Sequence, residues 1–351
     1  MGLLTLALSF GSITAPAVVA QESPAADGVD AETRALLDQA LSPPGLELTG
    51  TLVVVAFDDD GPSVSEFEVR GEAGGDLVAT TSGRWSFTND GRDAFVRAGG
   101  GPPLRLGALV DGVTTVEALL ANYRVSIGES RTLDTGDAIA LDLFSQSDGV
   151  QRERMWVDRS LGTIVRRETY GRDGKPRRLI ALTRIDVITR HSARAIPTDA
   201  PSQGELVDLD EEAPDILSRT GWSAPRVLPD GFRLRDAFVM GDATTSALHL
   251  VYSDGLYTVS VYEQPGRLAA DGRAGAVRTG NAVMPVWRWP GAEPERMVWT
   301  SGSMTFAAIT DAPHDVVLPV LAALPHDEPA SFAGRIRHGL GRVMSWLNPF
   351  A

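Results

Sequence analysis

Cysteine is absent from this chain of 351 residues, and Lys175 is the only lysine among its 32 basic residues. The absence of cysteine excludes disulfide scaffolds, thiolate metal sites and cysteine nucleophiles. The formal net charge is −14. A body with this charge repels the phosphates of nucleic acid and anionic lipid surfaces, so we expect no nucleic-acid partner.

The familiar catalytic and metal-binding motifs are missing as well. The five histidines show no metal-ligand spacing, and the chain contains neither His-Glu-x-x-His nor Gly-x-Ser-x-Gly. The acidic run 58–61 lacks the alternating ligands and the distal glutamate of a calcium loop, so a solvated turn explains it better. We therefore predict that the protein is not an enzyme and uses no metal and no cofactor.

The first 20 residues carry no charged side chain. An apolar run at 3–10 leads to the small residues Val18, Val19 and Ala20, as in a secretory signal peptide, although a basic n-region is missing. We expect a cleaved signal peptide at 1–20, with an uncleaved anchor or a disordered cytoplasmic leader as alternatives. The expected location is periplasmic, or the extracytoplasmic face of the cell membrane.

Residues 31–191 predict a first domain dominated by strands. A helix is expected at 31–41, where Asp30 can act as the cap, and a second helix at 113–123. Strand signals separated by tight turns recur at 48–57, 63–70, 77–81, 84–88, 93–97, 123–129, 138–146, 150–158, 163–170 and 178–188. We predict an α+β fold, mostly antiparallel, in which the helices cover one face of a large half-barrel sheet around an apolar trough.

A proline-bracketed acidic segment at 192–225 predicts a linker, or an extended crossing segment, before a second domain at 226–325. Strands are expected near 233–240, 246–252, 257–264, 283–289, 297–301 and 304–310. The domain should close with a helix at 315–324, in which Pro319 is tolerable only within about the first turn.

The clearest local signal lies in the second domain, where Ser253-Asp254-Gly255 separates two β-rich runs. Asp-Gly between such runs predicts a hairpin. Beyond the turn, Tyr257, Val259 and Val261 alternate with Thr258, Ser260 and Tyr262, which is typical of a half-buried antiparallel strand.

Aromatic residues give the only candidate binding sites. In the first domain a ligand trough is predicted from Trp85, Phe87, Phe95, Phe144 and Trp156, with a plain hydrophobic core as the simpler interpretation. In the second domain a partner surface is predicted from Tyr257, Tyr262, Trp287 and Trp289, because tyrosine and tryptophan anchor interfaces. These tryptophans can equally belong to the core.

The tail at 331–351 has apolar residues at helical spacing, a basic polar face and no acidic residue. It is interpreted as a basic amphipathic helix that docks on a membrane or a partner, or that packs on its own domain.

Several segments, in order, resemble the MucB/RseB family. They are Gly50-Thr51 with the strand that follows, the run from Met155 to Gly174, the strand Arg184-Ile-Asp-Val187, the turn Leu228-Pro-Asp-Gly-Phe232, the hairpin at 251–261 and the strand at 304–310. In the run from Met155 to Gly174, Ile164 stands where the family has a proline. The segment at 304–310 departs from the family's usual sequence. The similarity covers about residues 32–325.

The resemblance implies a first domain with the fold of lipoprotein carriers such as LolA. It also implies a second domain that binds the extracytoplasmic segment of a membrane-spanning anti-sigma factor and so modulates an envelope-stress sigma factor, and a first domain that senses lipid. From this we predict that the partner binds exposed strands that include 257–262, by strand addition or groove binding.

Two other classes of function compete with this prediction. One is a carrier of lipid or lipoprotein that uses only the first domain's trough, and the other is an enzyme that acts on cell-envelope polymers through a carboxylate pair.

Overall fold

The computed structural model describes residues 29–41, 47–58, 61–72, 76–80, 85–90, 94–98, 104–107, 115–189, 205–206, 217, 221–240, 247–268, 273–280, 285–289 and 294–326. The predicted signal peptide, the acidic run 208–212 and the basic tail lie outside these residues. Among the described helices, none is long and apolar enough to cross a membrane.

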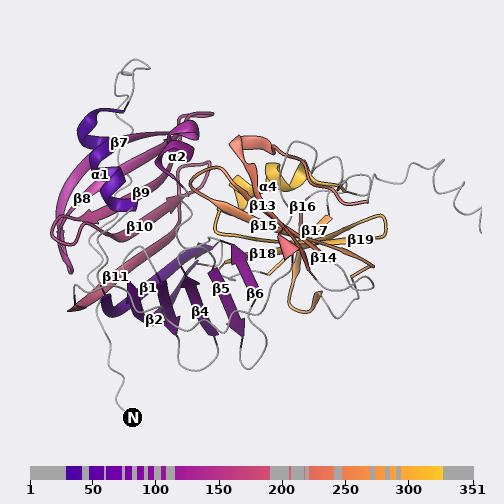
Figure 1. The fold of residues 1–351 in the computed structure, drawn as a ribbon, viewed down its shortest axis with the longest axis horizontal. Helices are drawn as coiled ribbons and strands as arrows, with labels where there is room; N and C mark the ends of the chain where they lie inside the picture. The colour runs from indigo at the N-terminus through magenta and orange to yellow at the C-terminus, as the bar shows by residue number, and fades with distance from the viewer. Residues whose placement is uncertain are drawn as a thin grey trace, which may run out of the picture.

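Eleven antiparallel strands form the first sheet, in the order β6-β5-β4-β3-β2-β1-β11-β10-β9-β8-β7. The strands are β1 (Glu47–Asp58), β2 (Gly61–Glu72), β3 (Asp76–Thr80), β4 (Trp85–Asp90), β5 (Ala94–Ala98), β6 (Leu104–Gly107), β7 (Tyr123–Leu133), β8 (Gly136–Ser145), β9 (Gln151–Asp158), β10 (Ile164–Tyr170) and β11 (Pro176–Thr189). The end strands β6 and β7 do not pair with each other, so the sheet is open (Figure 1).

Two helices pack on one face of this sheet, near β7–β10 (Figure 1). Helix α1 (Ala31–Leu41) begins where the Asp30 carboxylate accepts hydrogen bonds from the Thr33 N–H, at 2.8 Å, and from the Thr33 hydroxyl. Helix α2 (Val116–Asn122) has Thr115 as its N-cap, which accepts from the Ala118 N–H. Both helices and the mostly antiparallel α+β class were predicted correctly.

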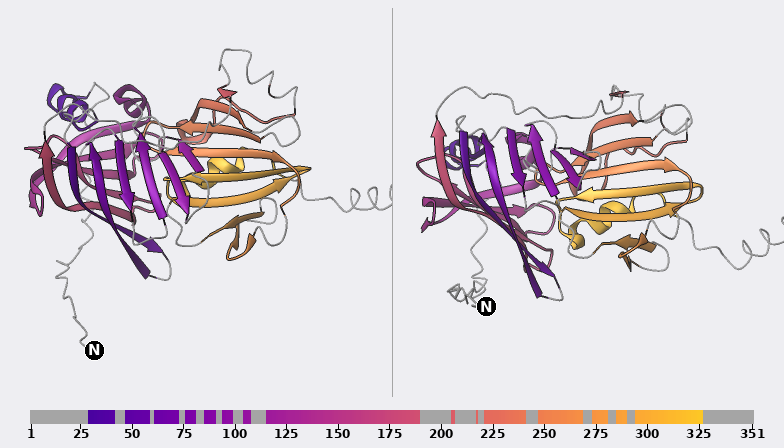
Figure 2. Two further views of the ribbon diagram at one scale, coloured as in Figure 1. Left: turned by 60° about the horizontal axis from the view of Figure 1, so that its bottom comes forward. Right: turned by 90° about the horizontal axis from the view of Figure 1, so that it is seen from below.

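The second sheet has eight strands in the order β12-β13-β14-β15-β19-β18-β17-β16. They are β12 (Glu205–Leu206), β13 (Arg233–Met240), β14 (Ala247–Ser253), β15 (Thr258–Pro265), β16 (Val277–Gly280), β17 (Pro285–Arg288), β18 (Glu295–Ser301) and β19 (Met304–Thr310). A short 3-10 turn, η1 (Pro229–Gly231), precedes β13, and α4 (His314–Ala322) follows β19. Figure 2 shows the two sheets side by side along the long axis of the molecule.

The structure corrects one expectation about the second sheet. Pro319 is the sixth residue of α4 rather than part of its first turn. Within the segment predicted as a linker or an extended crossing segment, Glu205 and Leu206 pair with Val239 and Phe238 as an edge strand. The short strands β6, β12 and β16 were not predicted, since runs of two to four residues carry no readable period.

One hydrophobic core joins the two sheets. It contains Leu37 of α1, Leu119 of α2 and Met155 of β9, together with Phe232 and Tyr257 from the second sheet's side of the molecule. All five side chains are fully buried. The sheets are therefore not independent packing units, and what positions one positions the other.

Candidate functional site

The described residues offer no catalytic arrangement. Within them, no group of three or more histidine, aspartate or glutamate side chains is placed to hold a metal ion. His249 is buried, with its ring stacked on Tyr262 at 4.2 Å and on Phe238 at 5.6 Å between ring centroids. His314 lies against Glu295, which also pairs with Arg288. Both histidines are therefore held in structural pairings.

Trp156 and Phe144, two residues of the predicted trough, belong to the face of the first sheet that the helices do not cover. Trp156 packs with Ala138, Ala140 and Val165 in a cluster separate from the main core. Its neighbours in β9, Met155 and Val157, belong to the core with α1 and α2, and successive strand residues face opposite sides.

The phase of β8 puts Phe144 on the same face as Ala138 and Ala140. Arg124 lies over the Phe144 ring at 5.2 Å, and Arg131 lies over the Trp156 ring at 5.4 Å. Arginine groups on both rings make this outer face amphipathic rather than a dry trough.

The other three trough residues lie in β4 and β5, where the structure describes backbone only. Trp85 pairs with Ala98, Phe87 with Val96, and Phe95 with Thr88. Phe95 is therefore out of phase with Phe87 in the ladder. The trough as a ligand site stays a prediction.

Tyr257 does not belong to an exposed partner surface. Its side chain is 0% exposed, and its hydroxyl donates a hydrogen bond of 3.0 Å to the carbonyl of Arg152 in the first sheet. The strand β15 that follows is paired on both sides, with β14 and with β19. Strand addition at 257–262 is excluded, because β15 has no free edge.

The hairpin itself was predicted correctly, but its surroundings were not. Tyr257, Val259 and Val261 share the core face as expected. Thr258 and Ser260 on the other face are 1% and 0% exposed, so the strand is buried on both faces rather than half-buried. Tyr262 is partly exposed and stacks on His249.

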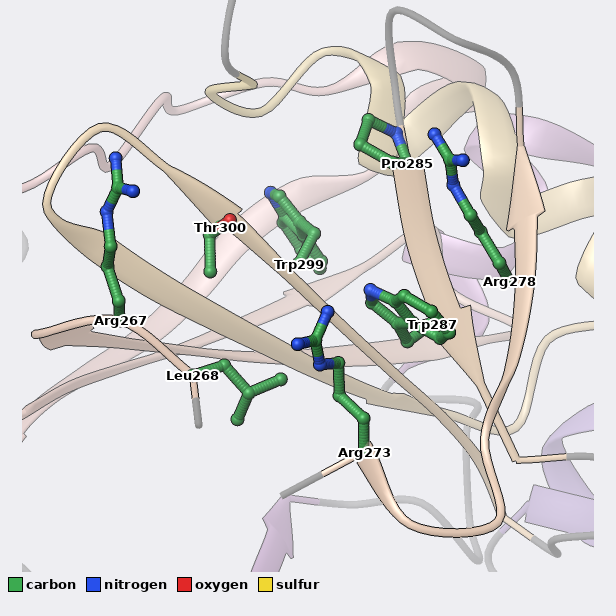
Figure 3. Close-up of a pocket in the computed structure, with 8 residues that line it drawn as sticks. All are labelled: Arg267, Leu268, Arg273, Arg278, Pro285, Trp287, Trp299 and Thr300. Carbon is green, nitrogen blue, oxygen red and sulfur yellow. The ribbon is translucent and has the colours of Figure 1, made fainter. Parts of the chain in front are cut away.

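Trp287 lines a pocket of about 410 Å³ near strands β16, β17 and β18 of the second sheet (Figure 3). The lining residues are Arg267, Leu268, Arg273, Arg278, Pro285, Trp287, Trp299 and Thr300. Trp299 is buried, with its ring stacked on Phe306 and its Nε1 donating to the carbonyl of Pro325. Trp289 is partly exposed beside the pocket and donates to the carbonyl of Ala274 at 3.0 Å.

Three arginines give this pocket its charge. The guanidinium of Arg273 lies 4.8 Å from the centre of the Trp287 ring, and Figure 3 shows it reaching toward the middle of the pocket. Arg278 is paired across the ladder with Trp287, which puts both on one face of the sheet. Arg267 stands on the opposite side of the pocket and donates through Nε to the carbonyl of Gly302.

Sequence reasoning identified Trp287 but missed the arginines. Arg267, Arg273 and Arg278 are five or six residues apart, and of the three only Arg278 lies in a strand, so no helical or strand period connects them. The available signal was weak: basic residues close to two tryptophans in a strongly acidic chain.

Two Asp-Gly turns of the second sheet, at 230–231 and 254–255, dock on helix α2. Gly255 has a φ of +96°, and a Cβ placed there would lie 2.5 Å from the backbone carbon of Ala118. Gly231 has a φ of +82°, and a Cβ there would meet the side chain of Asn122. Asn122 also donates to the carbonyl of Asp254 at 2.7 Å. Glycine is required at both turns because of positive φ and of close approach.

Charged groups are buried where the sheets meet. The Tyr123 hydroxyl donates to Asp254 at 2.5 Å, and Arg178 donates to the carbonyl of Asp311 at 2.7 Å. Burial raises the pKa of Asp254 to about 6 and that of Asp311 to about 7. Burial likewise raises the pKa of Tyr123 well above its usual value. We call this contact region, formed by the two turns, α2 and these buried groups, the interdomain joint.

Comparisons with known proteins found similarity among solved structures. No family model and no curated protein sequence matches the chain. Among solved structures, the crystal structure of MucB is 17% identical and covers 85% of this chain and 99% of its own, with a TM-score of 0.45. The chain is similar in fold to MucB.

Two further structures belong with that result. The MucA/MucB complex from Pseudomonas aeruginosa matches at 15% identity over 86% of this chain and 100% of that chain, with a TM-score of 0.45. A LolA superfamily protein from Nitrosomonas europaea matches at 12% identity over 45% of this chain and 94% of its own, with a TM-score of 0.26.

Proposed function

We propose that this protein is an exported, non-enzymatic regulator that binds the extracytoplasmic segment of a membrane-spanning anti-sigma factor and so modulates an envelope-stress sigma factor. The partner class comes from the ordered sequence motifs that resemble the MucB/RseB family. MucB itself has been solved in complex with MucA. The proposed units are a first domain at 31–191 and a second domain at 226–325.

The observation that carries this proposal is the interdomain joint. Two of the motifs that carry the resemblance, 228–232 and the turn at 253–256, dock the second sheet on α2. The glycines and aspartates of these motifs hold the second sheet on α2. Their presence in the motifs that resemble the MucB/RseB family supports a scaffold in which the two sheets are fixed to each other. A binding protein that presents one composite surface fits such a scaffold.

The packing of the helix-covered face favours a regulator over a lipid carrier. On this face Leu141, Leu143 and Met155 are 0% exposed, and they belong to the same core as Leu37 and Leu119 of the helices. A carrier needs a cavity for an acyl chain between sheet and helices. Side chains occupy that position in the described part of the first sheet.

The experiment that tests the proposal is a pull-down from solubilised membranes with the chain from residue 21 onward, followed by mass spectrometry. We expect a single-span protein with a cytoplasmic sigma-binding domain. Organic extraction of the purified protein is the companion measurement. Stoichiometric lipid that exchanges onto acceptor vesicles, without a protein partner, would replace the regulator by the carrier.

A further inference from the structure

The arginine-lined pocket lies beside a free sheet edge. Strand β16 ends the order of the second sheet and pairs only with β17 among the described strands. Val277 at its start is 48% exposed, and Arg278 next to it is exposed. An edge strand presents unpaired backbone N–H and C=O groups to which another extended chain can bond.

The charge of the pocket is opposite to that of the protein. The chain carries a net charge of −14, yet Arg267, Arg273 and Arg278 converge here. Within the described residues none of these three guanidinium groups forms an ion pair with a carboxylate. On the adjacent strand Arg288 does form such a pair, with Glu295. Three clustered cations that pair with no carboxylate of the described residues repel one another and favour an incoming anion.

We propose that an extended, carboxylate-rich segment of a partner protein adds to the free edge of β16 and places its acidic side chains in the pocket. The inference rests on the proposed function, because it specifies the chemistry of the segment that the regulator would bind. Strand addition gives affinity through backbone hydrogen bonds, while pockets beside the edge select alternate side chains.

The geometry favours carboxylates held by arginine over a purely apolar ligand. A guanidinium bonds a carboxylate with two parallel N–H donors. Packing over the Trp287 ring holds the Arg273 guanidinium in place before binding, which lowers the entropy that binding must remove. The apolar part of the lining, formed by Leu268, Pro285 and the two tryptophans, suits the stems of Glu side chains.

The first test uses the full chain and two labelled peptides. One peptide alternates Glu with Thr over about nine residues, and the other has Gln at each Glu position. Fluorescence anisotropy at low salt should give at least about tenfold tighter binding of the Glu peptide. The double substitution Arg273→Ala and Arg278→Ala should remove that preference. Arg184→Ala is the matched control, because Arg184 is a 61% exposed arginine on β11 of the other sheet.

Strand addition is tested separately from charge. N-methylation of alternate residues of the Glu peptide, in the two possible phases, should abolish binding in one phase and leave the other within about twofold. Equal weakening in both phases would overturn strand addition. Equal binding of the Glu and Gln peptides, or competition by inorganic phosphate at the peptide's own affinity, would overturn the carboxylate-selective site.

Failure of this site and failure of the proposed function give different results. If wild type and the arginine double variant capture the same anti-sigma factor from membranes equally well, the proposed regulator function is supported and the proposed role of the pocket is contradicted. If the Glu peptide binds through the pocket while no anti-sigma factor is captured, the pocket stands and the regulator is wrong. Unchanged thermal unfolding of the double variant shows that the comparison uses folded protein.

Discussion

Arg172, in the turn between β10 and β11, donates twice to Asp315 of α4, once from its backbone N–H to the carboxylate at 2.8 Å and once from Nε to the carbonyl at 3.0 Å. That carbonyl is free to accept because the residue four positions later is Pro319, which has no N–H. Pro319 thus leaves the Asp315 carbonyl available to Arg172, in a bond between α4 and the first sheet's β10–β11 turn. The cost of the proline to the helix is offset by a bond between the two sheets.

This relationship predicts non-additive stability effects. Arg172→Ala alone leaves the Asp315 carbonyl without its donor, and we expect it to lower the free energy of unfolding by about 1–2 kcal/mol. In a Pro319→Ala background the new N–H can bond the same carbonyl. The cost of Arg172→Ala should therefore be smaller there, by on the order of 1 kcal/mol. Urea unfolding of the four proteins of the cycle measures the difference.

The cycle also isolates the carbonyl from the other bonds of Arg172. Its ion pairs with Asp230 and Asp148 are lost in both backgrounds, so they cancel. Asp137→Ala is a suitable control, since Asp137 accepts a hydrogen bond from Thr132 within the first sheet and does not contact α4. Strictly additive effects of the two substitutions would show that Pro319 and Arg172 are not connected.

The close approach of Gly255 to α2 predicts that a substitution at this glycine destabilises the contact between the two sheets. Gly255→Ala would drive a methyl group into the backbone of Ala118 and Leu119, both within 2.6 Å, and neither backbone can move without shifting α2. We expect a loss of more than about 3 kcal/mol in the free energy of unfolding. Denaturation should change from one transition to two, because the common core is opened.

The control is Gly266→Ala, at a glycine that also has positive φ, +117°, but no atom within 4 Å of an added Cβ. Its cost should be confined to backbone strain, about 1–2 kcal/mol, and its unfolding should stay a single transition. If both alanine variants behaved alike, close packing on α2 would not be what couples the sheets.

Local order was predictable from the sequence, because its causes are local. The Asp30 cap and the spacing of Leu36, Leu37 and Leu41 determine α1, and Asp254-Gly255 determines the β14–β15 hairpin. The alternation along β8 and β9 was readable too. The alternation did not indicate which set of alternate residues would face the helices. Trp156 and Phe144 were therefore assigned to the predicted trough, but they lie on the sheet face opposite to the helices.

Burial by distant segments was not predictable. The sequence pattern of an Asp-Gly turn is the same whether the turn is exposed to solvent or packed on another part of the protein. The local sequence therefore did not indicate that the Tyr257 hydroxyl bonds to the carbonyl of Arg152. The arginine pocket was hidden for a related reason, since Arg267 and Arg278 come together only through the turns between β15 and β17. The interdomain joint and the pocket are tertiary features, and they carry the functional proposals.

Asp311 predicts a pH dependence of stability. Its pKa is raised to about 7 by burial, against the opposing effect of Arg178 and Arg167 and with a further rise from Asp254. The folded state therefore holds a proton between about pH 4 and 7 that the unfolded state releases, so stability from this group is fully present below that window and is lost as pH rises through it. Asp311→Asn should become more stable relative to wild type across that window, by up to about 1.4 kcal/mol per pH unit.

Urea unfolding of both proteins at several pH values checks this expectation. Asp186→Asn is the control, since Asp186 is 71% exposed on β11 and should give a flat difference from wild type. The Asp311 carboxylate accepts from the Thr258 N–H at 2.8 Å in the native protein. The amide oxygen that Asp311→Asn introduces can still accept this bond, so the substitution changes charge more than shape. A flat difference for Asp311→Asn would mean that Asp311 is ionised throughout this range.

The hydrogen bond from Tyr123 to Asp254 predicts a mutation whose cost grows with pH. Tyr123→Phe removes the hydroxyl that bonds the Asp254 carboxylate, a bond that holds the Asp254 pKa down against burial. Asp254 is ionised above about pH 6, and a buried carboxylate without its donor is costly. We expect the free energy of unfolding to fall by about 2–3 kcal/mol at pH 8 and by clearly less at pH 5, where the carboxyl is protonated in both proteins.

Tyr170→Phe is the control. It removes a comparable bond to Glu168 within the first sheet, at 2.7 Å and away from the joint, and should cost less than about 1.5 kcal/mol. A Tyr123→Phe penalty that is the same at both pH values would place the effect in packing, and the joint would then not depend on the charge of Asp254.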